Sequence, residues 1–137
     1  MTTRLAPSDS DAVRAALDTW IAGVEQADPA IVAQAMAPDE DLEYIGFQAD
    51  DWRIGWPAVR AALEAQAAAV KDIRITVVDT RIHPLRGGRA AYATSRWVIE
   101  GDVGGQHISM PLRCSWVLEK REDGWRLVHF HKSVAAG

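Results

Sequence analysis

The sequence lacks several features that would assign a protein to a class at once. Its 137 residues include one cysteine, Cys114, so no disulfide can form within the chain. No apolar run is long enough to cross a bilayer, and Met1–Ser10 has no apolar core of a signal peptide. The 15 Lys and Arg residues are scattered among 19 Asp and Glu. We therefore expect a cytoplasmic protein that binds neither nucleic acid nor membranes.

Phenylalanine and tyrosine are also scarce, at two each, but there are six tryptophans. Large amphipathic rings line cavities and interfaces, although ordinary core packing accounts for most tryptophans in proteins. The chain is 48% hydrophobic and long enough to bury a core. We expect a single domain over residues 1–137, with flexible ends at residues 1–8 and 134–137.

Three stretches have the periodicity of amphipathic helices. In the first, apolar residues recur every three or four positions between Val13 and Val24, and Ser8 or Ser10 can cap its start. Asp28 and Pro29 are a good N-cap and first residue for a second helix over 30–37. Trp56-Pro57 begins the third. Its apolar stripe is Val59, Leu63, Ala67 and Val70.

The remaining apolar segments alternate as strands do. Short strands are predicted at 42–47 and 52–55, with 48–51 as the turn between them, before the third helix. Four long strands follow at 73–83, 89–100, 107–120 and 125–133, separated by Gly-rich turns that include residues 101–105. Pro111 lies within a strand and predicts a bulge and a bend there. The fold class is α+β, in the order α-α-β-β-α-β-β-β-β.

The segment Leu118–Ser133, LEKREDGWRLVHFHKS, resembles the SnoaL-like branch of the nuclear transport factor 2-like superfamily. Its ending is similar to that of the association domain of calcium/calmodulin-dependent protein kinase II. The resemblance implies a cone-shaped cystatin-like fold, in which three N-terminal helices and a curved, mainly antiparallel sheet surround a cavity. It also implies dimers formed through the outer sheet face. Members of the superfamily have many activities, so the fold does not specify a reaction.

The predicted strand 107–120 divides into an apolar and a polar face. Met110, Leu112, Cys114, Trp116 and Leu118 alternate with polar residues, and we expect the apolar face to be concave. Strand pairing is then expected to add Tyr92, Thr94, Arg96, Val98, Val128, Phe130 and Lys132 to this face. The candidate ligand-binding residues are Tyr44, Trp56, Tyr92, Arg96, Cys114, Trp116, Phe130 and Lys132.

Arg96 permits two interpretations. A guanidinium that points into an apolar cavity needs an anionic partner, which would be a ligand carboxylate. Alternatively, Arg96 forms an ion pair with Glu43, Asp79 or Glu100, or lies open to water. In the kinase association domain, pocket arginines occupy the positions of Thr94, Trp116 and Lys132. Two of those three positive charges are absent here, which weakens a direct transfer of its carboxylate binding.

The outer face is expected to pair with a second copy of the chain. On the same facing assignment it carries aromatic and apolar side chains, and the predicted dimer interface is Trp97, Val117, Leu127 and His129. His129 and His131 share a face and, with His107, could bind a metal ion. No cysteine or carboxylate converges on them from the sequence. We therefore predict no metal site and no cofactor.

The leading functional hypothesis is a small-molecule-binding protein whose pocket takes a partly apolar ligand, carboxylated if Arg96 is unpaired. One alternative is an isomerase or dehydratase that uses pocket acid and base residues. Its candidates are Glu43, Asp79, Tyr44, Tyr92 and the two late histidines, and none belongs to a recognisable catalytic motif. Catalytic residues therefore remain unassigned. The other alternative is an oligomerisation module with a vestigial pocket.

Overall fold

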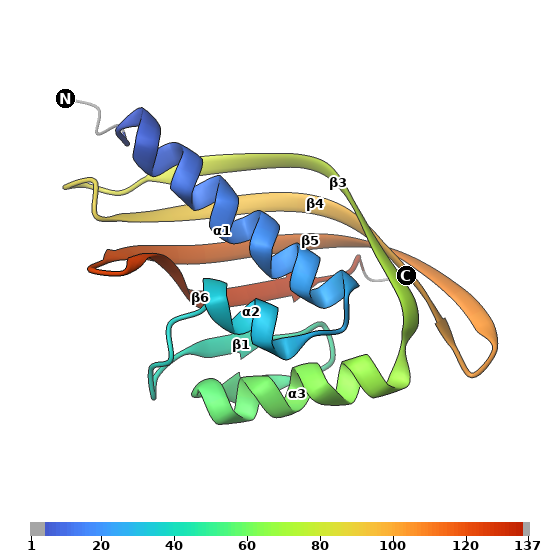
Figure 1. Cartoon of the computed structure of the whole chain (residues 1–137). Helices are drawn as coiled ribbons and strands as arrows, with labels where there is room; N and C mark the ends of the chain where they lie inside the picture. Colours follow the sequence, from blue (N-terminus) through green and yellow to red (C-terminus); the bar gives the residue numbers. More distant parts are fainter. Residues whose placement is uncertain (1–4, 136–137) are drawn as a thin grey trace.

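The computed structural model describes residues 5–135, as three helices over one six-stranded sheet (Figure 1). The helices are α1 (Pro7–Glu25), α2 (Pro29–Ala35) and α3 (Trp56–Ala69). The strands are β1 (Glu43–Ile45), β2 (Trp52–Ile54), β3 (Lys71–Pro84), β4 (Ala90–Val103), β5 (Gln106–Arg121) and β6 (Gly124–Ser133). This confirms the predicted α+β class and element order. Residues 1–4 and 136–137, which belong to the predicted flexible ends, lie outside the described residues, whereas Pro7 and Ser8 begin α1.

Each of the three helices begins at or next to a proline. All three have proline at the first or second helical position, where its missing N–H and fixed φ do no harm. Asp28 caps α2 as predicted, since its Oδ1 accepts a hydrogen bond from the Ala30 N–H at 3.0 Å. The prediction that Ser8 or Ser10 caps α1 is wrong. Its N-cap is Ala6, which offers no side-chain acceptor.

The strands form a mixed sheet in the order β2-β1-β6-β5-β4-β3. Hairpins join β3, β4, β5 and β6, and the short β1 pairs in parallel with β6. The bulge predicted at Pro111 is absent, because β5 keeps its register with β4 there. Pro111 lies beyond the last β5–β6 pair, Arg113 with Ser133, so β5 has a free edge at which a missing N–H is tolerated.

Close approach of the chain at Gly101 explains why this glycine is inside β4 rather than in the predicted turn. A Cβ at this position would lie 2.5 Å from Val70 Cγ1 and 3.2 Å from the Lys71 carbonyl oxygen. The turn between β4 and β5 is formed by Gly104 and Gly105, which both have positive φ. Gly101 thus lets the end of α3 reach the sheet. Across residues 5–135, no helix is both long enough and apolar enough to cross a membrane.

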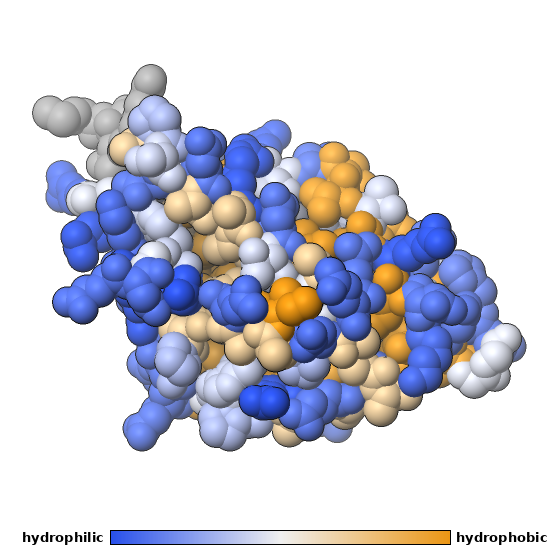
Figure 2. All heavy atoms as spheres, in the orientation of Figure 1, coloured by the Kyte–Doolittle hydropathy of each residue, from blue (hydrophilic) through white to orange (hydrophobic). Residues whose placement is uncertain are grey.

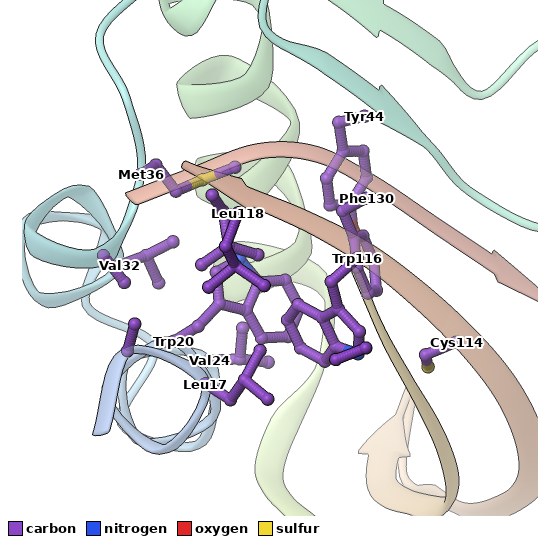
Figure 3. Close-up of a cluster of buried hydrophobic side chains, with 14 of the residues drawn as sticks. Leu17, Trp20, Val24, Val32, Met36, Tyr44, Cys114, Trp116, Leu118 and Phe130 are labelled. Carbon is purple, nitrogen blue, oxygen red and sulfur yellow. The ribbon is translucent and has the colours of Figure 1, made fainter. Parts of the chain in front are cut away.

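Aromatic rings fill one half of the space between the helices and the sheet. Trp20 of α1 lies 5.2 Å from Trp116 and 4.8 Å from Phe130, measured between ring centroids, and Trp97 lies 5.4 Å from Trp116. Figure 3 shows Trp20 reaching from its helix to the sheet residues, with Tyr44 above Phe130. These four rings, Trp20, Trp97, Trp116 and Phe130, are at most 2% exposed. We call this region the aromatic half.

The concave face of β4 is the opposite of the predicted one. Ala93 pairs with Trp116 and Trp97 pairs with Leu112, so Ala91, Ala93, Ser95 and Trp97 face the helices. Tyr92, Thr94, Arg96 and Val98 therefore face outward. The small residues of β4 that face the helices leave room for the ring of Trp20 above Trp116. The larger residues that alternate with them would not fit there, so they face outward.

A bulge in the β5–β6 pairing decides where Leu127 points. The register shifts between Val117 and Leu118, so Leu118 pairs with Leu127 while Trp116 pairs with Phe130. Both Leu127 and Phe130 are consequently buried under the helices. The prediction of Leu127 and Trp97 as dimer-interface residues is wrong, since both belong to the core. The concave placement of Phe130 and Lys132 is confirmed.

Candidate functional site

A pocket of about 380 Å³ opens beside the aromatic half. The last turns of α3 form one wall, the loop between β1 and β2 forms another, and the hairpin half of β4 and β5 forms the floor. The lining is mainly apolar. Its residues are Phe47, Gln48, Asp51, Ala65, Gln66, Ala69, Val70, Ile73, Ile99, Glu100, Ile108, Met110, Leu112 and Lys132. We call this region the pocket half.

Lys132 is the ionisable side chain that the fold buries in this wall. It extends from β6 on the concave face and is 7% exposed. Its Nζ lies 5.7 Å from the ring centroids of both Tyr44 and Phe47, a distance at which aromatic rings attract a cation. No hydrogen bond or ion pair joins Lys132 to any residue in the range 5–135. The Lys132 side chain is thus largely buried without a counter-ion, an arrangement that favours a ligand able to supply negative charge.

The two acidic residues in the lining have partners of their own. The Asp51 carboxylate lies 3.6 Å from Nε of Arg53, and the Glu100 carboxylate lies 3.3 Å from Nε2 of His107. His107 also contacts Asp102 at 3.1 Å through Nδ1. Both contacts raise the pKa of His107 above its ordinary 6.5. The hydrogen bond with Asp102 has the larger effect and that with Glu100 the smaller one. Asp51 and Glu100 are therefore paired with other residues of the protein, whereas Lys132 is available to pair with a ligand.

Carboxyl groups with a shifted pKa lie outside the pocket. Hydrogen bonds from Trp125 and Lys120 lower the pKa of Asp9, those from Arg121 lower that of Asp39, and those from Arg96 lower that of Asp79. Each shift favours the ionised form. A general acid in a dry pocket would need the opposite shift.

Cys114 lies next to Lys132 in the β5–β6 pairing and is 4% exposed. Burial raises the pKa of its thiol to about 12, although the positive charge of Lys132 acts in the other direction. In Figure 3 it stands apart from the ring cluster, on the side of the sheet residues. The thiol is protonated at neutral pH, so it contributes packing rather than a nucleophile.

The predicted ligand residues do not converge on one site. Lys132 lies in the pocket, with Tyr44 beside it. Trp116 and Phe130 are fully buried in the aromatic half, and Trp56 packs partly buried at the start of α3. None of these last three lines the pocket.

Tyr92 and Arg96 are on the other side of the sheet, so their predicted place in the cavity is wrong. Tyr92 is 40% exposed and stacks on His83 at a centroid distance of 4.4 Å. Arg96 donates two hydrogen bonds to the Asp79 carboxylate, from Nε at 3.0 Å and from Nη2 at 2.8 Å. The alternative interpretation, an ion pair with Asp79, is the one that holds.

The histidines do not converge. His129 pairs with Val117 and lies 3.3 Å from Glu43, whereas His107 is at the opposite end of β5. Within the described residues, no three His, Cys, Asp or Glu side chains are placed to hold a metal ion. The sequence reasoning missed the contribution of α3 and of the β1–β2 loop to the pocket. The available signal was the alanine-rich end of α3, whose side chains leave space.

Three helices on the concave face of a curved sheet, packed with rings at one end and hollow at the other, define the class of conical α+β proteins with an internal pocket. Residues 13–137 match the model of the SnoaL-like domain family, and the chain belongs to that family. None of the curated proteins matches it.

Solved structures show the same fold at low sequence identity. A nuclear transport factor 2-like superfamily protein from Salmonella enterica serovar Typhimurium is 21% identical, with a TM-score of 0.84 over 93% of this chain and 94% of that one. A protein with a cystatin-like fold from Caulobacter vibrioides is 18% identical, with a TM-score of 0.80 over 94% and 91%. A proposed calcium/calmodulin-dependent protein kinase II association domain from Xanthomonas campestris is 21% identical, with a TM-score of 0.78 over 98% and 95%. These matches confirm the predicted cystatin-like fold, and the match of residues 13–137 to the SnoaL-like domain confirms the predicted family.

Proposed function

We propose that this SnoaL-like protein binds a small, partly apolar molecule that carries a carboxylate, and that Lys132 is the anchor for that group. The observation behind the proposal is the buried, unpaired Lys132 ammonium in the wall of an otherwise mainly apolar pocket. A pocket of about 380 Å³ is in the range that binds small organic ligands.

The lining suggests how such a ligand would lie. Its carboxylate would pair with Lys132 Nζ between the rings of Tyr44 and Phe47. Its apolar part would contact the aliphatic floor that includes Ile99, Ile108 and Met110. The anion would then neutralise the buried charge, and the apolar part would supply most of the buried area. This arrangement would account for the presence of the buried Lys132 cation beside an apolar floor.

Binding is a better proposal than an isomerase or dehydratase reaction. Such a reaction needs an acid or base whose pKa is adjusted toward neutrality and which reaches the substrate. In the lining, Asp51 and Glu100 already contact Arg53 and His107, and the thiol of neighbouring Cys114 stays protonated. The open pocket also argues against a module whose cavity is vestigial.

Calorimetric titration tests the proposal with a panel of aromatic and aliphatic acids and the matching amides. We expect acids to bind better than their amides, and Lys132→Met to weaken acid binding by roughly tenfold or more, since a charged hydrogen bond contributes about 1.5–3 kcal/mol. Amide binding should change much less.

Arg96→Leu is the matched control, because it removes a positive charge from the opposite face of the sheet. It should leave acid binding unchanged. Equal binding of acids by wild type and Lys132→Met would reject Lys132 as the anchor. A loss in Arg96→Leu equal to that in Lys132→Met would indicate a general charge effect instead.

We also propose a homodimer through the outer sheet face around Val117 and His129. Val117 is half-buried in the isolated chain and pairs with His129, and Tyr92 is the neighbour of Val117 on β4. These side chains form the less polar part of that face, which a second copy could cover. Light scattering at micromolar concentration should give twice the chain mass, and Val117→Asp should give the monomer. A wild-type monomer would contradict the proposal.

A further inference from the structure

Three buried indole N–H groups have no hydrogen-bond acceptor within residues 5–135. They belong to Trp20, Trp97 and Trp116, whose side chains are at most 2% exposed. An indole nitrogen can only donate, and a buried donor without an acceptor costs free energy that the rest of the fold has to offset. Because buried polar groups in proteins almost always have a partner, these nitrogens point to an acceptor that comes from outside the chain.

Trp97 differs from the other two because it borders the pocket. Its pairing partner on β5, Leu112, lines the pocket, and so does Ile99, the next residue along the same face of β4. Trp20 and Trp116 lie deeper in the aromatic half, and none of the residues that pair with Trp116 lines the pocket. Trp97 is therefore the unpartnered donor that a ligand in the pocket can approach.

Lys132 and Trp97 flank β5 on the concave face. Lys132 pairs with Cys114 from β6, and Trp97 pairs from β4 with Leu112, two residues away from Cys114 on β5. The two flanking strands are two strand spacings apart, which is about 10 Å. The pocket covers this distance, since its lining includes both Lys132 and Ile99. One ligand of moderate length can therefore contact both donors.

We propose that Trp97 is a second ligand-binding residue of this pocket, and that its indole N–H selects acids with a neutral oxygen acceptor, such as a ketone, several carbons from the carboxylate. The inference rests on the proposed function, because Lys132 must hold the carboxylate for the ketone to be placed at Trp97. In the complex, a rotamer change of Leu112 would uncover Nε1, and the ligand oxygen would accept its hydrogen bond. Binding then satisfies a donor that the free protein leaves unpaired, which penalises a ligand that lacks the acceptor.

The experiment compares benzoylbutyric acid with phenylvaleric acid, which has a methylene group in place of the ketone. In calorimetric titrations of the whole chain, the oxo acid should bind roughly fivefold or more tightly. Trp97→Phe keeps an aromatic ring but removes the N–H. It should abolish or reverse this preference and leave the affinity for phenylvaleric acid nearly unchanged.

Trp116→Phe is the matched control, because it removes an equally buried, unpartnered N–H that does not border the pocket. It should keep the preference for the oxo acid. NMR spectra of the wild-type chain test the contact independently of how well either variant folds. The indole N–H signal of Trp97 should shift and exchange more slowly with solvent when benzoylbutyric acid binds, and phenylvaleric acid should change it much less.

Several results would overturn the inference. These are equal affinity of the wild type for the two acids, a preference that survives in Trp97→Phe, or a Trp97 signal that neither acid changes, which would mean that a buried water already accepts from the indole. A failure of the proposed function gives a different pattern. Neither acid then binds, or both bind Lys132→Met as well as the wild type, and the role of Trp97 is rejected with it.

Discussion

The aromatic half and the pocket half lie under the same strands but are filled differently. In β4 and β5, Trp97 pairs with Leu112, and two residues along Ile99 pairs with Met110. Over the first pair, α1 contributes the large ring of Trp20. Over the second, α3 contributes Ala65, Ala69 and Gln66. The size of the helix side chains therefore decides where the cone is solid and where it is hollow.

The surface reflects the same division. Figure 2 shows hydrophobic atoms exposed mainly on the right of the view, over the bent part of the sheet, whereas the left side is mostly hydrophilic. Val77 and Val78, at the irregularity in β3, are among the exposed large hydrophobic residues. The aromatic half is a closely packed core, whereas the pocket half leaves apolar surface that a ligand or partner could cover.

Trp116→Ala should give the largest effect on stability. We expect a loss of about 3–5 kcal/mol in the free energy of unfolding, since the rings around Trp116 cannot collapse fully into the space it leaves. Met110→Ala in the pocket half should lose about 1 kcal/mol or less, because its side chain already borders a hollow. Denaturant melts measure both. Similar losses at the two positions would show that the halves are equally packed.

Lys132→Met should increase the free energy of unfolding, whereas Trp116→Ala should decrease it. Removal of a buried ammonium without a counter-ion relieves its desolvation, and we expect a gain of about 1–2 kcal/mol, offset in part by the lost contacts with Tyr44 and Phe47. Denaturant melts without ligand measure this change. A large loss of stability would mean that Lys132 supports the fold and is not held ready for a ligand.

Much of this architecture could be predicted from the sequence, because helical spacing, Asp28-Pro29 and the Gly-rich turns are local signals. The facing of β4 could not, since Tyr92, Arg96 and Val98 alternate as plausibly as Ala91, Ala93 and Trp97. What decides between them is the pairing of Ala93 with Trp116 and the arrival of Trp20 from α1, both of which are long-range. The bulge that turns Leu127 inward has no local signal either. Lys132 could be predicted as a ligand-binding residue from the sequence. The contribution of α3 to the pocket wall is visible only in the structure.

The reactivity of the Cys114 thiol measures how far solvent reaches the boundary between the aromatic half and the pocket half. With its pKa raised to about 12, it should react with a disulfide reagent at pH 8 about a thousandfold more slowly than an exposed thiol. Lys132→Met should slow it further, because the positive charge that favours the thiolate is gone. Kinetics with Ellman's reagent measure both rates, and the unfolded chain supplies the control. Rapid reaction of the native protein would indicate that the boundary opens to solvent.

The smallest effect should come from His107, at the tip of the β4–β5 hairpin. Asp102 and Glu100 raise its pKa in the folded state above the ordinary 6.5. Its contribution to stability is therefore fully present below pH 6.5, provided that both carboxylates are ionised, and it is lost as the pH rises through the folded-state pKa. His107→Gln should lower the denaturant midpoint at pH 6 and leave it nearly unchanged at pH 9. Trp116→Ala should lose the same amount at both pH values, because no charge is involved. If His107→Gln shows equal midpoint shifts at pH 6 and pH 9, its contacts with Asp102 and Glu100 do not stabilise the hairpin through charge.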